Sequence, residues 1–396
     1  MRITMHTRAA RWCALWSALA LVACGGGGGD GSVGAGGTGG SATPEATVVA
    51  PITGFGSVIV GGVRFDDSAS SVSSDDGTLS RSDLRLGMMV QVRGSIAADG
   101  TTGVASSIRA FSEIKGPIES LTAGGQGFAV MGVTVRVDAS TVYANVGSLA
   151  GLAVGDFVEV NGLRDPASGS VRATRVERKS ASAGDELKSR GIARSPNPTA
   201  RTFTLGTLTV SFANARLDGV GTNGPSDGDL VTVRASQPPA GGVLVATRVQ
   251  REDGSTFDDG GQAEVEGIVS SFASIASFRV ANVPVDGSNA VFTRGSIAGV
   301  VNGARIEVKG RSSGGVLRAT QIKVEEGDDA FEAELRGTID SFTSIASFVV
   351  RGQVVDASAA TFSDGSASSL AAGRRVEVRG VLQGSIVKAT RVKFDD

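Results

Sequence analysis

Five stretches of the chain share one alternation of apolar and polar positions. Each begins with a glycine and two further residues, after which apolar residues, mostly valine, alternate with polar ones. Alternation with a period of two is typical of a strand that buries one face and exposes the other. The opening glycines lie 68, 73, 75 and 70 residues apart and are Gly87, Gly155, Gly228, Gly303 and Gly373.

Two further sequence lines recur with the same spacing. A line such as "IKGPI", "SRGIA", "VEGIV" or "LRGTI" opens each copy, with "ITGFG" in the first, and a line such as "RATRV" or "KATRV" closes it. Self-similarity at a fixed period is the signature of a repeat architecture. The sequence therefore predicts five tandem modules of about 65–75 residues, which we place at 48–112, 113–180, 185–252, 262–326 and 332–396.

The last module illustrates the order of elements within one copy. "ELRGTIDSF" predicts a first strand, and "SFVVRGQVVDAS" predicts two strands joined at Arg351-Gly352. "SASSLAAG", which ends at Gly373, predicts one or two helical turns, because Ser favours a helix N-cap and Gly favours its C-terminal end. "RRVEVRG" and "GSIVKATRVKF" predict two final strands.

This order of elements predicts an all-β fold. Three strands, a short helix and two strands in about 65 residues are typical of the OB-fold, a small barrel whose closure removes exposed strand edges. We therefore predict five tandem OB-fold-like β-barrel modules, each with a short helical turn between strands three and four. The recurring helical insert favours barrels, and the alternatives are a small open sheet and a β-solenoid.

The closing strand contains a further signal. In module 5 its apolar parity switches at Ala389-Thr390, and four copies show the same switch at an Ala-Thr pair. A strand that continues to face one core through such a switch requires an extra residue, which is a β-bulge. The alternative is that the small alanine faces solvent.

The N-terminus predicts export and lipid anchoring. Residues 1–23 carry three arginines and then an apolar run, Trp12–Ala23, which is too short to span a bilayer and is typical of a signal peptide. The run ends in "LVAC", which resembles a bacterial lipobox. That resemblance implies cleavage before Cys24, lipidation of Cys24 and attachment to a membrane. The alternative is an ordinary signal peptide with a chance cysteine.

A glycine-rich segment follows the lipidated cysteine. We predict that residues 24–47 form the anchor and a disordered tether, because glycine loses much entropy on ordering and this segment offers little to bury. Gly25, rather than Asp, follows Cys24 and favours sorting to the outer membrane. The predicted location is therefore the cell envelope, on the periplasmic side of the outer membrane or on its surface.

Removal of the signal peptide changes the chemistry available to the chain. His6, the only histidine, and both tryptophans leave, and Cys24 is consumed by lipid. The remaining 35 Lys and Arg and 40 Asp and Glu give a formal charge of −5. Without imidazole or free thiol, the mature chain cannot build a Ser–His–Asp or Cys–His site, a Cys/His zinc site or a disulfide. We predict no catalytic, cofactor-binding or metal site.

The repeated pattern resembles a bacterial envelope family known as domain of unknown function 5666. The motif is G-x-I, then F-x-V-x-G, L-x-x-G-x-x-V-x-V-x-G and G-x-x-x-A-T-x-V, and it covers nearly all of 48–396. The resemblance implies an envelope lipoprotein with tandem copies and supplies no catalytic residues. Module 3 departs from it at Ala235, where other copies have Gly, and at Pro225, where modules 1, 2 and 5 have Leu84, Leu152 and Leu370. We expect that module to be distorted.

Several functional classes fit the sequence poorly. Single-strand nucleic-acid binders need a basic groove and aromatic platforms, whereas this chain is acidic with few aromatic residues, so we expect no nucleic acid. The acidic joints lack EF-hand spacing, although a loose calcium site there is an alternative. Glu159, Glu307 and Glu377 recur in the fourth strand, but Gln and Thr replace them elsewhere, which indicates a surface position and not a hydrolase pair.

Binding or scaffolding remains. We predict a non-catalytic envelope lipoprotein that presents several modules to an envelope partner, either a protein or a polysaccharide. The alternative is capture of a small ligand or metal ion in one barrel module, for which the irregular module 3 is the first candidate. Loss of one module distinguishes them, because bridging weakens gradually whereas a single pocket has one indispensable module.

Overall fold

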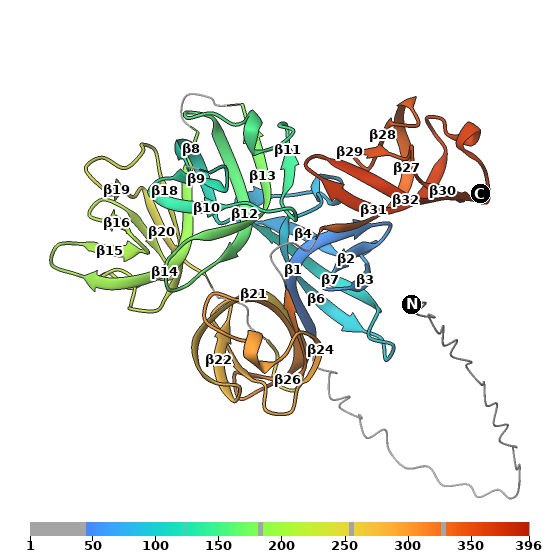
Figure 1. Cartoon of the computed structure of the whole chain (residues 1–396). Helices are drawn as coiled ribbons and strands as arrows, with labels where there is room; N and C mark the ends of the chain where they lie inside the picture. The colour runs from blue at the N-terminus through green and yellow to red at the C-terminus, as the bar shows by residue number, and fades with distance from the viewer. Residues whose placement is uncertain (1–44, 123, 181–184, 253–256, 326–329, 396) are drawn as a thin grey trace, which may run out of the picture. The chain divides into compact units, whose positions relative to one another are not determined.

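The computed structural model describes residues 45–122, 124–180, 185–252, 257–325 and 330–395 (Figure 1). The signal peptide at 1–23, the lipidation site Cys24 and nearly all of the predicted tether lie outside the described residues. The first strand begins at Ala46, within the range predicted for the tether, which reached residue 47. No helix in the described part of the chain is long and apolar enough to cross a membrane.

The first two modules have nearly the same series of elements. Module 1 comprises β1 (Ala46–Phe55), β2 (Val58–Val60), β3 (Val63–Asp66), β4 (Ser71–Ser74), β5 (Gly77–Thr78), the 3-10 turn η1 (Arg81–Asp83), β6 (Met89–Ile96) and β7 (Thr102–Phe111). Module 2 comprises β8 (Ile114–Leu121), β9 (Gly127–Val130), β10 (Val133–Arg136), β11 (Val142–Ala144), η2 (Leu149–Gly151), β12 (Phe157–Arg164) and β13 (Val171–Lys179).

The last three modules repeat the series with one irregular member. Module 3 comprises β14 (Leu187–Asn197), β15 (Thr202–Leu205), β16 (Leu208–Ser211), β17 (Arg216–Asp218), β18 (Leu230–Ala235), β19 (Val243–Val245) and β20 (Arg248–Arg251). Module 4 comprises β21 (Gln262–Ser274), β22 (Ser277–Val280), β23 (Val283–Asp286), β24 (Val291–Arg294), η3 (Ile297–Gly299), β25 (Arg305–Ser313) and β26 (Val316–Glu325). Module 5 comprises β27 (Glu332–Ser344), β28 (Ser347–Val350), β29 (Gln353–Asp356), β30 (Thr361–Ser363), η4 (Ala367–Ser369), β31 (Arg375–Gln383) and β32 (Ile386–Asp395).

The described chain is therefore all-β with five repeats, as predicted. The alternation read from the sequence places one face of each long strand in a core: Val376 and Val378 of β31 are fully buried, whereas Arg379 is exposed. One short strand was missed. In module 5 it is β30, which pairs in parallel with β32, and its three residues are too few for a periodic signal.

The predicted helical turns are not found as such. In four modules a three-residue 3-10 turn occupies that place, and the described residues of module 3 have none. The turn ends at a buried apolar residue, such as Leu84 in module 1 or Leu370 in module 5, so it serves to bury one side chain. Module 3 has Pro225 at this place, also buried.

The strand order predicted five separate barrels, and this prediction is wrong. First strands of different modules pair in parallel: Thr47–Val49 of β1 pairs with β21, and Gly54–Phe55 pairs with β27. Strands β8 and β14 pair antiparallel at Ser189 and Ile114. The described strands thus join into a 19-stranded sheet from modules 1, 4 and 5 and a 13-stranded sheet from modules 2 and 3.

The length of the first strand explains this continuity. Strand β1 has ten residues, whereas its hairpin partner β2 has three and pairs only at Ile52 and Gly54. Half of one edge of β1 would be left unpaired in a separate barrel, and an exposed edge favours pairing with another strand. Strand β21 occupies that edge, so the sheets run from module to module as in a β-solenoid, the alternative considered from the sequence.

The predicted β-bulge is present in the closing strand. In module 5, Arg379 lies opposite Arg391 and Gly380 lies opposite Ala389, so Thr390 is the extra residue. Its hydroxyl donates a hydrogen bond to the Arg379 carbonyl at 3.1 Å. Modules 1, 2 and 4 show the same register shift at Ser106, Thr174 and Thr320.

The glycine opposite the bulge is required by close packing. A Cβ at Gly380 would lie 2.3 Å from the Lys388 carbonyl oxygen, and the equivalent distances in modules 1, 2 and 4 are 2.0, 2.4 and 2.1 Å. Module 3 has Ala235 instead, and there the closing strand divides into β19 and β20 around Ala246-Thr247. The methyl group of Ala235 explains the expected distortion of module 3, because it prevents the two strands from continuing side by side.

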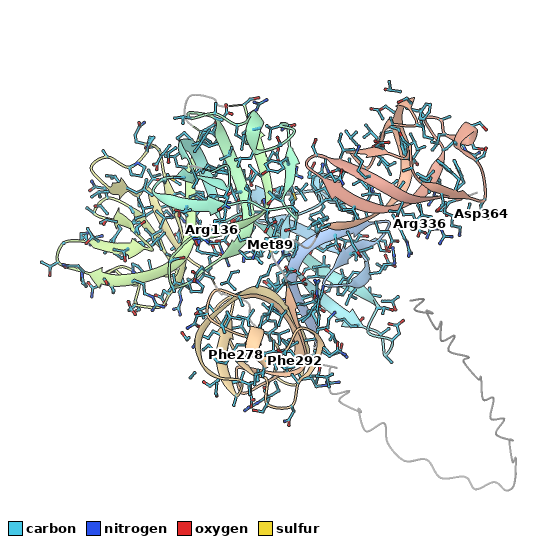
Figure 2. All side chains as sticks on the ribbon, in the orientation of Figure 1. Met89, Arg136, Phe278, Phe292, Arg336 and Asp364 are labelled. Atoms are coloured by element: carbon cyan, nitrogen blue, oxygen red, sulfur yellow. The ribbon has the colours of Figure 1, made fainter. Side chains whose placement is uncertain are left out.

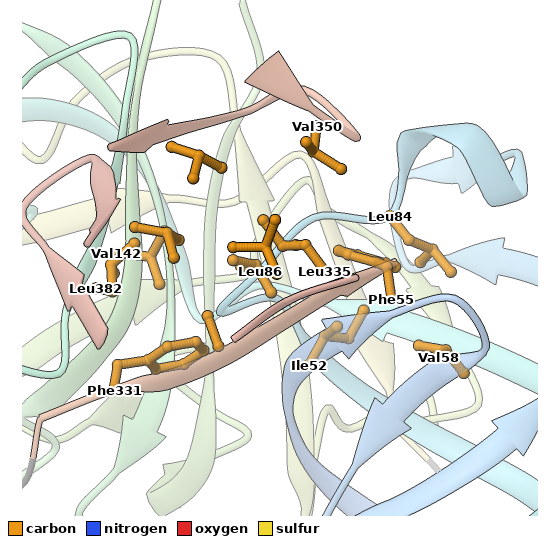
Figure 3. Close-up of a cluster of buried hydrophobic side chains, with 14 of the residues drawn as sticks. Ile52, Phe55, Val58, Leu84, Leu86, Val142, Phe331, Leu335, Val350 and Leu382 are labelled. Atoms are coloured by element: carbon orange, nitrogen blue, oxygen red, sulfur yellow. The ribbon is translucent and has the colours of Figure 1, made fainter. Parts of the chain in front are cut away.

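Apolar side chains of several modules share one core. The described residues from Glu45 to Asp395 form one compact unit, and their largest cluster of buried apolar residues combines module 1, module 5 and Val142 of module 2. Figure 3 draws this cluster, with Ile52 and Phe55 of β1 in the same group as Leu335 of β27. Each module of this size has only a marginal core alone, so shared burial stabilises the array.

Candidate functional site

Among the described residues, buried charged side chains gather where modules meet. The residue three positions before the glycine of the first strand is charged in modules 2 to 5, and in modules 3 and 4 the strand around it is mainly buried. A buried charge is costly unless it is paired, so each of these residues requires a partner. The four are Glu113, Lys188, Glu264 and Glu334, which we call the junction positions.

Lys188 of module 3 is fully buried against module 1. Its Nζ lies 3.0 Å from Asp75 Oδ2 and 3.0 Å from Asp76 Oδ1, and Arg234 Nη2 lies 2.9 Å from the same Asp76 oxygen. Burial raises the pKa of the Asp75 carboxyl. Burial also opposes ionisation of Asp76, but Lys188 and Arg234 outweigh it and lower the pKa of Asp76. An ion cluster around the buried Lys188 therefore holds the two modules together.

Glu113 of module 2 forms a second cluster with module 3. Its carboxylate accepts a hydrogen bond from Arg164 Nε at 2.9 Å and another from Arg190 Nη1 at 2.7 Å. The Arg190 guanidinium also lies 4.6 Å from the centre of the Phe111 ring, a distance that allows a cation–π contact. Burial lowers the pKa of Arg164, opposed by the attraction of Glu113.

Glu264 of module 4 faces the hairpin of module 1. Its Oε2 lies 3.1 Å from Lys309 Nζ, which donates a hydrogen bond to the Gly61 carbonyl at 2.8 Å. Oε1 is buried without a hydrogen-bond partner among the described residues. Burial raises the pKa of Glu264 well above its usual value, only partly offset by Lys309.

The fourth junction position is less buried. Glu334 of module 5 pairs with Arg64 of module 1 and lies 3.5 Å from Arg379 of its own module. Its side chain is 18% exposed, compared with 0% for Lys188. Three junction positions thus pair with a charge of another module, and Glu264 lies against the backbone of one.

A cavity of about 390 Å³ lies where modules 1 to 4 meet. Its walls are mainly apolar, and its charged lining residues are Glu113, Arg164, Arg190 and Glu266. Glu266 is matched by Arg305, whose Nη2 lies 2.6 Å from it. The apolar wall includes Val49, Met89 (labelled in Figure 2), Phe111, Leu163, Ile192 and Ile268.

The carboxylates considered from the sequence do not assemble into one site. Glu159, Glu307 and Glu377 lie in three different modules, and each pairs with a lysine or arginine of its own module, at 3.1, 3.1 and 2.9 Å. Of the acidic joint, Asp259 accepts a hydrogen bond from the Gly314 backbone N–H at 2.7 Å. No group of three or more His, Cys, Asp or Glu able to hold a metal occurs among the described residues.

Cys24, the one site residue predicted from the sequence, lies outside the described residues. The junction positions were missed, although a signal was present. In four of the five copies a charged residue stands three positions before the first-strand glycine. The partners could not have been found in this way, because Asp75 and Asp76 belong to a loop more than 100 residues away from Lys188.

Comparison with known proteins agrees with the repeat. The profile of the family "Domain of unknown function (DUF5666)" matches residues 46–109, 115–177, 195–250, 266–323 and 336–393. A solved structure, Drosophila Unr CSD456, is similar at 16% sequence identity and a TM-score of 0.14, over 48% of this chain and 84% of that chain. No curated protein matches the sequence. The five matches span most of the chain, and the protein belongs to the DUF5666 family.

Proposed function

We propose that the protein is a non-catalytic, lipid-anchored envelope protein that presents its modules as one binding or scaffold unit to an envelope protein or polysaccharide. One observation carries the proposal: the charged residues of the junctions are engaged in holding modules together. Lys188, Glu113 and Glu334 each contact a charge of another module. Residues used in this way stabilise the array of modules and leave its outer faces available for a partner.

The N-terminus supports the predicted location. The "LVAC" segment and the glycine-rich stretch after Cys24 fit an anchor and a tether in front of β1. We propose attachment through lipid on Cys24, with outer-membrane sorting favoured by Gly25. Replacement of Cys24 by Ser abolishes lipidation if this assignment is right, and metabolic labelling with a radioactive fatty acid measures it.

We also propose that each module retains an OB-like strand order inside the continuous sheets. In module 5, β27 pairs with β28, β28 with β29, β29 with β32 in parallel, β32 with β31, and β31 again with β27. This closed series of pairings supports the proposal, while the first strand still offers an edge to other modules.

The test is crosslinking in intact cells, followed by mass spectrometry of the proteins that co-purify with the acylated chain. Crosslinks from several modules to one envelope protein are expected if the chain is a scaffold for a protein. Crosslinks confined to the chain itself contradict that version and leave polysaccharide as the partner, for which retention on purified envelope polysaccharide is the measurement.

A second candidate function, capture of a small ligand, is favoured by the cavity. That cavity is lined by four modules and not by one. Binding of a ligand in this cavity does not depend on the scaffold proposal.

A further inference from the structure

We propose that the cavity between modules 1 to 4 binds a small carboxylate with an apolar body, such as a medium-chain fatty acid, and that Arg190 receives the carboxylate. The proposal concerns a different site from the outer faces that would contact an envelope partner. Its test is separate from the tests of lipid anchoring and of scaffolding.

The walls of the cavity suit an apolar body. Its volume of about 390 Å³ lies within the range of small-molecule sites. The lining combines aliphatic and aromatic side chains from four modules, so an apolar ligand bound there would remove apolar surface from water.

The polar edge of the cavity suits one anionic group. Glu113 has two arginine partners, Arg164 and Arg190, so this cluster carries one net positive charge. The lining carboxylate on module 4, Glu266, is already neutralised by Arg305. The cavity therefore favours an anion over a cation.

The two arginines differ in how many of their N–H donors remain unused. Arg164 uses Nε and Nη2 on Glu113 and Nη1 on the Gly169 carbonyl, so all three nitrogens are occupied. Arg190 donates one hydrogen bond, from Nη1 to Glu113, among the described residues. A guanidinium has five N–H donors and matches a carboxylate bidentately. Arg190 is therefore the residue that can receive a carboxylate without losing its present partner.

The repeat supplies matched controls. Arg190-Gly191-Ile192 in module 3 corresponds to Arg336-Gly337-Thr338 in module 5 and to Glu266-Gly267-Ile268 in module 4. Arg336 pairs with Asp395 and is partly exposed, and neither it nor Thr338 lines the cavity. Substitutions of Arg336 and Thr338 therefore change an equivalent strand and leave the cavity lining unchanged.

The experiment uses the mature chain from residue 24 carrying Cys24→Ser, and titrates it with decanoate and with decan-1-ol in a calorimeter. We expect one decanoate per chain, bound about tenfold or more tightly than decan-1-ol, which cannot form the ion pair. Ile268→Trp, which fills the cavity, should abolish binding, and Thr338→Trp should leave it unchanged. Arg190→Gln should reduce decanoate affinity to that of decan-1-ol, and Arg336→Gln should not.

Several outcomes overturn the proposal. Absence of decanoate binding at 1 mM, or equal binding by Ile268→Trp, rejects the cavity as the site. Equal affinity for decanoate and decan-1-ol in the unsubstituted chain rejects the role of Arg190. Because Arg190→Gln also removes a partner of Glu113, Arg190→Lys is the second variant: it keeps the charge, loses the bidentate fork and should give intermediate affinity.

Discussion

Modules 3 and 5 have nearly the same strand order. They differ at two places: the residue opposite the closing strand and the junction position. Opposite the closing strand, module 5 has Gly380 and an unbroken β32, whereas module 3 has Ala235 and a strand divided into β19 and β20. At the junction position, module 3 has the fully buried Lys188 and module 5 has the partly exposed Glu334. One difference is local to the module, and the other depends on what packs against it.

The comparison separates two kinds of rule in a repeat protein. The bulge and its glycine depend on neighbouring strands of the same copy, so one substitution explains the change in one copy. The junction positions depend on another module, so equivalent residues take opposite charges: Lys188 faces two aspartates, and Glu334 faces Arg64. The following predictions test this separation, from the largest expected effect to the smallest.

Removal of the junction charge in module 3 should have the largest effect. Lys188→Met leaves the buried Asp75 carboxylate without its lysine partner, and breaking a buried pair costs about 3–5 kcal/mol. The matched change Glu334→Gln in module 5 should cost about 1 kcal/mol or less, because that pair is more exposed. Urea unfolding of both variants gives the free energies, and equal losses would contradict the distinction between the two junctions.

The glycine opposite the bulge should follow. Gly380→Ala places a Cβ 2.3 Å from the Lys388 carbonyl oxygen, so the strands must shift, and overpacking of this kind costs about 1–3 kcal/mol. Ala235→Gly in module 3 relieves no such contact and should change stability by about 1 kcal/mol or less. A Gly380→Ala variant as stable as the parent would show that the close approach is not what keeps β32 continuous.

The pH dependence of stability should reveal the junction of module 4. Burial raises the pKa of Glu264, so the folded state holds a proton that the unfolded state releases between its ordinary pKa and the raised one. Stability from this group is therefore full below about pH 4.5 and is lost as pH rises through the raised value. Glu264→Gln should be more stable than the parent at pH 8, with the difference vanishing at pH 4. A difference of the same size at both values would contradict the assignment.

The hydroxyl of the bulge residue should have the smallest effect. Thr390→Val removes the hydrogen bond to the Arg379 carbonyl at an exposed position, which costs about 0.5 kcal/mol. Thr247→Val in module 3 removes an equivalent bond to Arg234 at 3.1 Å and should cost the same. A much larger loss at Thr390 would indicate that the hydroxyl, and not the glycine, maintains the bulge.

The sequence predicted what depends on local pattern. Alternation at Val376 and Val378, the parity switch at Ala389-Thr390 and the departure at Ala235 each follow from residues a few positions apart or from direct comparison of copies. The predicted helical turn is longer than the one observed. The serine cap and the terminal glycine that indicated it enclose only a three-residue 3-10 turn.

The remaining features depend on pairs distant in the chain. Nothing near β1 in the sequence indicates that Thr47–Val49 pairs with β21, so separate barrels were predicted where sheets continue. The cavity was not predictable for the same reason, since Met89, Leu163, Ile192 and Ile268 come from four modules. A charge within a buried strand was the available signal for a junction, and it did not identify the partner.

Hydrogen exchange measured by mass spectrometry across a urea titration tests most directly whether shared strands and buried ion pairs unite the modules. The slowest-exchanging amides of each module report the free energy of the opening that exposes them. If the modules form one cooperative unit, these amides in all five modules should give the same free energy and the same dependence on urea. Five distinct free energies, each with the weak urea dependence of a small domain, would contradict that account.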